Sequence, residues 1–427
     1  MITIGVFLLI QAAGAYDPTG VHVDAQGVLR SRTVDPDPRL AELRKNAKSL
    51  KKDAKLLYVS LPRLFAEARR IVESGKPLPE EIRGIGGMTK LQYVFVYPDA
   101  MDLVIAGPAE PFDAKEAYRP LGKLSGRPVF HFEDLVTAFR AFGPGKKPDR
   151  LGCDIEITKE IRERVAAKVK AVGPTASVIG FRKACDQIAE AGGPQPVKYY
   201  GLDTQTRFAF VCVEADYRLK QLALGILPSP VSKVQSYRSL IEKPEDELRF
   251  SLESNYDALL ASPDGNAFEL RGASLKVNGG LLGHPESKPE DMSASGRRFM
   301  AMCNENFDAL VRQILSWADL CNLGDLSVLA ALVAEDKLAE KAGWNLGWVL
   351  DPKTCPIATM SAPASAATTD VRAKSGSVSS LWTEAPSKTP QWPWSVYSQR
   401  HTSAITSRSG VAFFMARIAR GMIPSGS

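Results

Sequence analysis

The chain has 427 residues, of which 44% are apolar and 24% charged, so it is long enough for two or more globular domains. Its net charge of +6 is mild for this size, and a local group of basic residues lies between Arg44 and Lys55. This distribution favours a solvated helix face over a nucleic-acid-binding protein, which usually gathers Lys and Arg beside a groove or a stacking platform.

The first fifteen residues predict an export signal. A short apolar run precedes Ala13-Gly14-Ala15, which fits the small-x-small pattern of a cleavage site. No Lys or Arg comes before the run, so a true start further upstream and a buried first strand stay open as alternatives. We expect cleavage after Ala15, an extracytoplasmic location (periplasmic or secreted), and no transmembrane segment in the mature chain.

Residues 16–145 form the predicted N-terminal helix and hairpin region. Gly20–Arg30 predicts a strand pair around a Gln-Gly turn. Apolar residues at steps of three and four over Leu40–Leu57 predict a helix, which packs either on its own domain or on a partner. A second helix is expected to start at Ser60 and to end before Gly75.

A β-hairpin follows, with strands at Leu91–Tyr97 and Asp102–Gly107. Both runs are apolar on both faces, so we expect the hairpin to be central and covered, with few reactive side chains. The segment Arg127–Phe132 then predicts a strand that His131 closes and a helix whose apolar side extends to Phe142. Gly and Pro residues at 143–148 suggest a domain boundary.

Residues 150–280 form the predicted central α+β domain, which ends in an antiparallel meander. Its expected strands and helices are strand Leu151–Ile157, helix Thr158–Val172, helix Ser177–Ala191, strand Val197–Tyr200, strand Thr206–Val213, a helix from Asp216 to Leu224, and the meander strands Arg249–Leu252, Asp257–Ser262 and Ala267–Arg271.

Residues 292–350 predict an αα-hairpin. Its first helix carries an apolar stripe from Phe299 to Cys321, and Gly324 separates it from a second helix, Leu326–Ala342. Residues 351–393 have the composition of a flexible linker, and residues 394–427 form a tail that could contact an envelope surface through a short basic segment. The predicted fold is thus α+β throughout.

The chemistry-bearing residues predict no metal or cofactor site. The four histidines are far apart, and the sequence motifs of zinc peptidases, α/β-hydrolases, P-loop proteins and dinucleotide enzymes are absent. The six cysteines are widely spaced, so we expect buried free thiols rather than a disulfide framework. Cys153 could be a nucleophile but has no evident histidine partner.

Two local clusters remain as candidate sites. His131, Glu133 and Asp134 could serve acid–base chemistry, but a strand end followed by the acidic first turn of a helix explains them better. Glu214, Asp216, Tyr217 and Arg218 follow the predicted strand Phe208–Val213, at the kind of strand end where α/β sites gather. A helix cap at Asp216 and surface ion pairs are the structural explanation of this second cluster.

Several segments resemble a family of exported planctomycete proteins known only as a domain of unknown function. They are Gly20–Leu29, Gly87–Glu110, Arg127–Phe142, Leu151–Ile157 and, most specifically, Val213–Val231. The resemblance spans roughly residues 20–350 and implies export and a shared fold. It implies no activity, cofactor or catalytic residue.

The resulting hypothesis is a non-catalytic extracytoplasmic protein that binds or scaffolds a protein partner or an envelope component. The alternative is a periplasmic hydrolase that uses Glu214 and Asp216, with Tyr217 and Arg218 nearby. The hydrolase needs these side chains to converge in one concave pocket. The binding protein needs an exposed apolar patch, expected on the Leu40–Leu57 or the Phe299–Cys321 helix.

Overall fold

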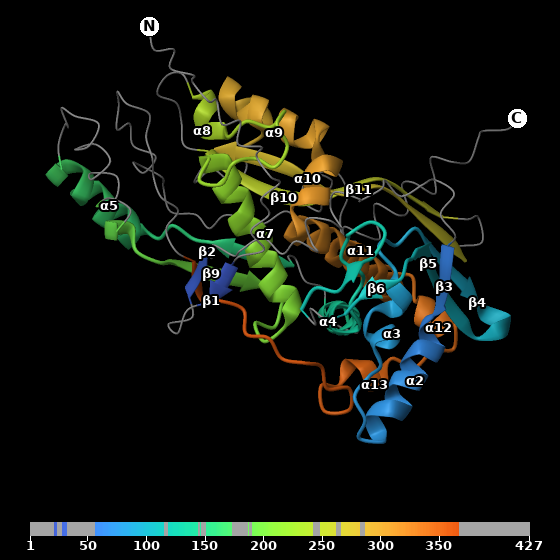
Figure 1. Ribbon diagram of the computed structural model, residues 1–427. Helices are drawn as coiled ribbons and strands as arrows, with labels where there is room; N and C mark the ends of the chain where they lie inside the picture. Colours follow the sequence, from blue (N-terminus) through green and yellow to red (C-terminus); the bar gives the residue numbers. More distant parts are fainter. Residues whose placement is uncertain are drawn as a thin grey trace, which may run out of the picture.

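The computed structural model describes residues 21–23, 28–31, 56–114, 118–143, 146, 151–172, 187, 190–241, 248–261, 266–281 and 287–366 (Figure 1). Helices and mostly antiparallel sheets occur along the whole described chain, which confirms the predicted α+β class. The long helix α7 (Arg207–Leu224) runs through the middle of the molecule.

The predicted hairpin lies inside a five-stranded sheet with the order β10-β11-β4-β5-β3. Its strands are β4 (Tyr93–Tyr97) and β5 (Asp102–Pro108), joined by the 3-10 turn η2 (Pro98–Ala100), which confirms the hairpin. The other strands are β3 (Leu56–Ser60), β10 (Leu248–Ala261) and β11 (Ala267–Leu281).

A second five-stranded sheet has the order β1-β2-β12-β9-β8. Its strands are β1 (Val21–Val23), β2 (Val28–Ser31), β12 (Ser365–Ala366), β9 (Gln195–Tyr200) and β8 (Gly152–Ile155). The predicted strand pair at Gly20–Arg30 is confirmed, and so are the predicted strands Leu151–Ile157 and Val197–Tyr200, which the structure pairs as β8 and β9. A two-stranded sheet, β6 (Phe112–Asp113) with β7 (Leu121–Gly122), lies between the hairpin and α4 along the chain.

Helix α2 begins at the capping residue predicted from the sequence. Ser60 caps α2 (Leu61–Glu73), as predicted, because its hydroxyl accepts a hydrogen bond from the Arg63 backbone N–H. The remaining helices are α3 (Glu80–Arg83), η1 (Ile85–Gly87), α4 (Phe132–Ala141), α5 (Lys159–Val172), α8 (Tyr237–Leu240), η3 (Pro289–Asp291), α9 (Ala294–Glu305), α10 (Phe307–Gln313), α11 (Leu315–Glu335), α12 (Leu338–Lys341) and α13 (Gly347–Leu350).

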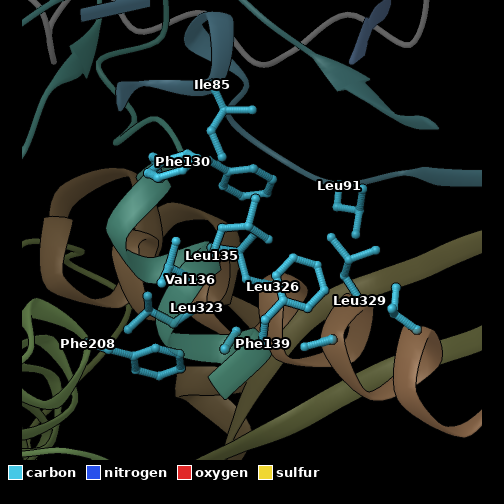
Figure 2. Packing of buried hydrophobic residues seen from close by; sticks show 14 of the residues in the cluster. Ile85, Leu91, Phe130, Leu135, Val136, Phe139, Phe208, Leu323, Leu326 and Leu329 are labelled. Carbon is cyan, nitrogen blue, oxygen red and sulfur yellow. The ribbon is translucent and has the colours of Figure 1, made fainter. Parts of the chain in front are cut away.

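The main core forms where α4 and α11 pack against each other and against the inner face of the β4–β5 hairpin. Phe139 and Leu135 of α4 lie beside Leu326 and Leu329 of α11 (Figure 2). Asp325 fixes α11 to the sheet, because it accepts hydrogen bonds from the Leu91 backbone N–H at 3.0 Å and the Ser274 hydroxyl at 2.8 Å. This core also includes Ala366, so one cluster of buried residues spans several of the predicted regions, whose boundaries stay predictions.

The predicted strand Thr206–Val213 is wrong, because these residues begin α7. Thr206 is the N-cap, with its hydroxyl accepting from the Ala209 N–H, and Gly225 ends the helix at a φ of 66°. All residues of α7 except Lys220 and Leu224 are buried. A helix that is buried on all sides shows the same unbroken apolar run as a buried strand.

The predicted meander and αα-hairpin also differ from the structure. Two long strands, β10 and β11, replace the three short ones. Gly324 lies within α11, and the helix breaks fall instead at Asn306 and Ile314. The strand predicted to end at His131 is absent from residues 127–131, which contain only an isolated bridge at Pro128.

Three further predictions fall partly outside the described residues. Most of the predicted Leu40–Leu57 helix does so, and its last two positions belong to strand β3. The predicted helix Ser177–Ala191 is described only at residues 187, 190 and 191, which are helical. Residues 351–366 of the predicted linker pack on the body of the protein, where Cys355 is buried and β12 pairs with β2 and β9; residues 367–393 and the tail are not described.

One described segment, Leu315–Ala334 of α11, is long and apolar enough to cross a membrane by length and composition. Of its 18-residue apolar window, 83% is buried inside the protein, and core helices of soluble proteins pass the same test. The expectation that no segment crosses a membrane therefore stays a prediction.

Candidate functional site

The predicted site residues lie on α7 but point in different directions. Glu214 and Arg218 are four residues apart and share one face of the helix, whereas Asp216 lies roughly 200° around the axis from each. Glu214, Asp216, Tyr217 and Arg218 are all buried. The helix thus divides them between separate environments.

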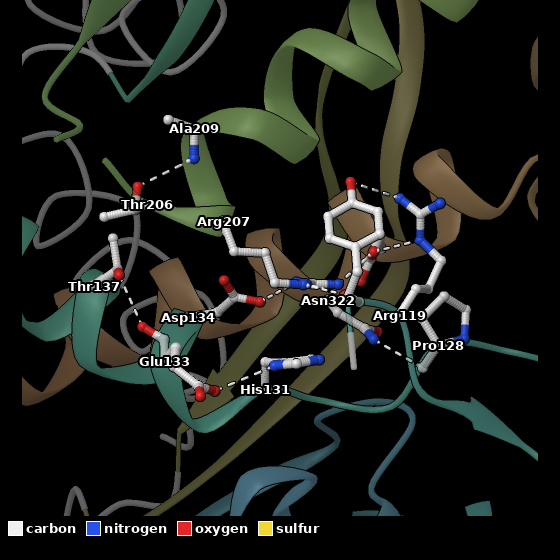
Figure 3. Close-up of polar contacts among 12 residues, drawn as sticks. Arg119, Pro128, His131, Glu133, Asp134, Thr137, Thr206, Arg207, Ala209 and Asn322 are labelled. Atoms are coloured by element: carbon white, nitrogen blue, oxygen red, sulfur yellow. Dashed lines mark hydrogen bonds and ion pairs between the residues drawn. The ribbon is translucent and has the colours of Figure 1, made fainter. Parts of the chain in front are cut away.

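Glu214 belongs to a buried group of five charged residues, which we call the charge network: Arg119, Asp134, Arg207, Glu214 and Asp319. Figure 3 labels three of them, Arg119, Asp134 and Arg207. Arg207, at the start of α7, donates to Asp134 of α4 and, at 2.5 Å, to Asp319 of α11. Arg119, which precedes β7, donates to the same Asp319 oxygen at 2.7 Å and to Glu214 at 2.6 Å. Four segments of the chain therefore meet through charged hydrogen bonds.

Tyr118 contacts three members of the charge network: Glu214, Arg207 and Arg119. Its hydroxyl donates to Glu214 Oε2 at 2.8 Å, and its backbone carbonyl accepts from Arg207 Nε at 2.6 Å. The guanidinium carbons of Arg119 and Arg207 lie 4.8 and 5.3 Å from the centre of its ring, within the range of cation–π attraction.

The burial of these charges shifts their pKa values. Burial disfavours the charged form of Arg119, but Glu214, Tyr118 and Asp319 outweigh it and hold the pKa of Arg119 well above its ordinary value. Burial also opposes ionisation of Asp319, yet Arg207 and Arg119 lower the pKa of that carboxyl. At Asp134 burial prevails over Arg207, and the pKa is raised.

Three carboxylates face two guanidiniums in the charge network, so one negative charge is in excess when all five groups are ionised. The raised pKa of Asp134 is consistent with this excess, and Asp134 Oδ1 has no hydrogen-bond partner among the described residues. Within the network, the pKa of the Asp134 carboxyl is thus raised and that of the Asp319 carboxyl is lowered.

His131 and Glu133 flank this network at the start of α4. His131 Nδ1 lies 3.2 Å from Glu133 Oε2, and Arg83 lies 3.4 Å from the other oxygen of Glu133. Glu133 and Asp134 occupy the first turn of the helix, as predicted, but Asp134 is buried against Arg207. Sequence reasoning placed Asp134 correctly and missed its partner.

Replacement of Glu133 by Gln is expected to remove part of the acid sensitivity of the fold. Burial alone would raise the pKa of Glu133, but His131 and Arg83 outweigh it and lower the pKa from 4.5 to about 2. Its ionisation therefore contributes stability that is complete above pH 4.5 and is lost as the pH falls towards 2, about 3 kcal/mol in all. In urea titrations, the difference between wild type and Glu133→Gln should shrink over this interval, and a constant difference would contradict the assignment.

The opposite face of α7 carries Asp216, which is paired with Lys220 at 2.5 Å. Burial disfavours the charged Lys220, but Asp216 and then Asp154 of β8 raise its pKa. Cys153 and Cys212 lie nearby, and burial raises the pKa of both thiols, so neither is an activated nucleophile. The five described cysteines are free and buried, as predicted.

Tyr217 and Arg218 complete the predicted group. Tyr217 packs in the main core, and Arg218 Nη1 contacts Gln221 Oε1 at 3.3 Å. Among the described residues there is no group of three or more His, Cys, Asp or Glu side chains that could hold a metal ion.

A second feature lies at the surface, on the outer side of the hairpin. Tyr93, Phe95 and Tyr97 of β4 alternate with buried Val94 and Val96, and Tyr58 of β3 lies beside Phe95. The ring centroids of neighbouring pairs are 6.3 Å apart for Tyr58–Phe95, 5.7 Å for Tyr93–Phe95 and 6.4 Å for Phe95–Tyr97. We call these four residues the aromatic face.

The aromatic face corrects the expectation that the hairpin is covered on both sides. Tyr58 is 59% exposed and Tyr97 is 48% exposed, whereas Val94 on the inner side is fully buried. The strands read as apolar on both faces because tyrosine and phenylalanine favour strands whether or not they are covered. The Phe299–Cys321 stripe, one of the two places where an exposed patch was expected, is sealed within a second core cluster.

Taken together, the fold and the buried charges define an α+β protein organised around a central helix. Residues 153–237, which include this helix, match a family model described as a protein of unknown function (DUF1598). The resemblance to a family of unknown function is thus confirmed over this segment, while planctomycete origin and export stay predictions. No curated protein and no solved structure matches the chain.

Proposed function

We propose that this protein is a non-catalytic binding protein that contacts a protein partner through the aromatic face. The single observation that supports this proposal is the row of neighbouring rings at the surface, in which Tyr58 and Tyr97 are exposed and Tyr93 and Phe95 are partly buried. Aromatic side chains are enriched at protein interfaces, where they provide a large contact area at a small cost in side-chain entropy. Exposed apolar patches of this kind mark interaction sites more often than chance surface.

The alternative, a hydrolase that uses Glu214 and Asp216, has less support from the geometry. Glu214 Oε2 already accepts hydrogen bonds from Tyr118 and Arg119, and Asp216 pairs with Lys220 on the other side of α7. A general acid or base must come within hydrogen-bond reach of a substrate, and both carboxylates are 2% exposed. The charge network is better explained as a link between four segments of the fold.

The partner is tested by affinity capture from the envelope fraction with matched variants. Wild type and Leu124→Ala, which alters a 65% exposed apolar side chain outside the aromatic face, should retain the same protein. A Tyr93→Ala/Tyr97→Ala variant should lose it by at least tenfold, with an unchanged melting temperature. Equal capture by all three proteins, or no specific capture by wild type, contradicts the proposal.

Extracytoplasmic location is part of the proposal and is supported by the apolar N-terminus and Ala13-Gly14-Ala15. N-terminal sequencing of the protein from its natural host tests it. We expect the mature chain to begin at Tyr16, and an intact Met1 would contradict export.

A further inference from the structure

Arg63 lies in the first turn of α2, directly after strand β3, and its side chain is 80% exposed. It forms a loose ion pair with Asp102, because 3.6 Å separate Arg63 Nη2 from Asp102 Oδ2, which is longer than a hydrogen bond. Asp102 is held more closely by its other oxygen, which accepts from the Ser60 hydroxyl at 2.5 Å and from the Leu103 backbone N–H at 2.9 Å. Most of the Arg63 side chain is thus exposed to solvent.

The strand register places Arg63 at one end of the aromatic face. Asp102 is opposite Tyr97 in the β4–β5 ladder, and opposite residues of a ladder project to the same side of a sheet. Leu103, the next residue, is fully buried on the inner side, so Asp102 lies on the outer side with the rings. Arg63 contacts Asp102 there, since α2 continues directly from β3 next to the hairpin strands (Figure 1). An exposed cation therefore lies at the Tyr97 end of the aromatic face.

The arginine at the other end of the aromatic face is engaged within the fold. Glu269 of β11 is opposite Tyr93 in the ladder, so it too lies on the outer side of the sheet. Arg271 Nη2 is 2.7 Å from Glu269 Oε2, which is hydrogen-bond length. Arg271 thus has a hydrogen-bonded counter-ion, whereas 3.6 Å separate Arg63 from its own.

An arginine at this position does not favour the stability of α2. Arg63 is the third residue of the helix, where the helix dipole favours an acidic side chain and disfavours a cation. After a Ser N-cap such as Ser60, Glu or Gln is the usual third residue, because it completes a capping box. The first turn of α2 contains no acidic residue. Arg63 is therefore explained better by a contact outside the fold than by the helix that carries it.

We infer that Arg63 forms an ion pair with a carboxylate of the protein partner when that partner covers the aromatic face. The partner surface is then acidic: it presents Asp or Glu beside the groups that contact Tyr58 and Tyr97. Arginine binds a carboxylate through two parallel hydrogen bonds, and tyrosine and arginine are enriched among the residues that contribute most to protein interfaces. The inference rests on the proposed function, since it assigns the chemistry of the partner at the same surface.

Two matched substitutions on α2 separate this role from a structural one. Arg63→Gln removes the charge and suits the first turn of a helix, so its melting temperature should be no lower than that of wild type. Arg69→Gln makes the same change at an arginine that pairs with Glu73 at 2.7 Å. In affinity capture from the envelope fraction, Arg63→Gln should retain about tenfold less of the partner, and Arg69→Gln as much as wild type. Full capture by Arg63→Gln, or equal losses for the two variants, overturns the inference.

Cross-linking identifies the partner's carboxylate directly. Arg63→Lys keeps the positive charge and supplies an amine, which a water-soluble carbodiimide joins to a carboxylate as an amide, while the carbodiimide takes up the released water and becomes a urea. In the captured complex, mass spectrometry should find the peptide that contains position 63 joined to an Asp or Glu of one other protein. Arg69→Lys should give no such link. A link to a second copy of this chain, or no link to another protein at position 63, contradicts the acidic partner.

The outcomes show which of the two proposals has failed. If Tyr93→Ala/Tyr97→Ala loses the partner and Arg63→Gln keeps it, the proposed function stands and the acidic partner is rejected. If wild type captures no specific protein, both are rejected. Vesicles of phosphatidylglycerol test the competing anion, a lipid headgroup: wild type should not sediment with them. Sedimentation that Arg63→Gln abolishes would assign Arg63 to a membrane surface and reject the protein carboxylate.

Discussion

The Arg207→Met variant is expected to unfold with a free energy about 3–5 kcal/mol lower than that of the wild type. Arg207 is the shared cation of Asp134 and Asp319, both of which are buried. Methionine fills much of the same space but carries no charge, so Arg119 is the only guanidinium left near these two carboxylates. Removal of one partner from a buried ion pair lowers the free energy of unfolding by about 3–5 kcal/mol, because the remaining charge is buried without compensation. Urea denaturation at neutral pH measures it.

Arg69→Met is the matched control for this variant. Arg69 pairs with Glu73 at 2.7 Å on the surface of α2, with both side chains more than half exposed. Its loss should lower the free energy of unfolding by less than about 1 kcal/mol. The effect of Arg207→Met should also shrink at acidic pH, because protonation removes the uncompensated negative charges. Similar losses for the two variants would contradict the role given to the charge network.

Trp317→Ala is expected to lower the free energy of unfolding by about 3–5 kcal/mol, again in urea denaturation. Trp317 of α11 is fully buried in the second core cluster, where its ring stacks on Phe307 with centroids 5.9 Å apart. Its indole N–H also donates to the Ala215 carbonyl of α7 at 3.2 Å. Alanine leaves a cavity between α11 and α7 and removes the hydrogen bond from the indole that links the two helices.

A conservative variant at the same position separates packing from the hydrogen bond. Trp317→Phe restores most of the volume but not the donor, so it should lie between wild type and Trp317→Ala. The exposed Leu124→Ala variant should stay within about 0.5 kcal/mol of wild type. A Trp317→Ala variant as stable as wild type would show that this cluster does not hold α11 in place.

The helices and strands could be predicted from the sequence where an element buries one face and exposes the other. The β4–β5 hairpin and the helix after Ser60 have turn and cap residues next to alternating or helical patterns, and both were found. Helices α7 and α11 are buried nearly all round, so their sequences lack a polar face. For α7 this produced a false strand, and for α11 a false break at Gly324. The cap residues Thr206 and Gly225 were the available signal for α7.

The candidate site could be predicted only in part, because its contacts are distant in sequence. Glu214 was named, but its partner Arg119 lies 95 positions away, and Arg119 is 200 positions from Asp319. No local pattern reports such pairs. Asp319 and Asp325 within the apolar run of α11 were the remaining signal, since an acid on a helix that is apolar on every side must be buried and needs a partner.

The position of the charge network has a consequence for the segment that matches the family model. Residues 153–237 contain Arg207 and Glu214, but Arg119, Asp134 and Asp319 all lie outside it. Excised as a polypeptide, this segment would retain a helix with apolar residues on every side and two ionised groups without their counter-charges. The matched segment therefore marks the middle of a larger folding unit, and autonomous folding is not expected of it.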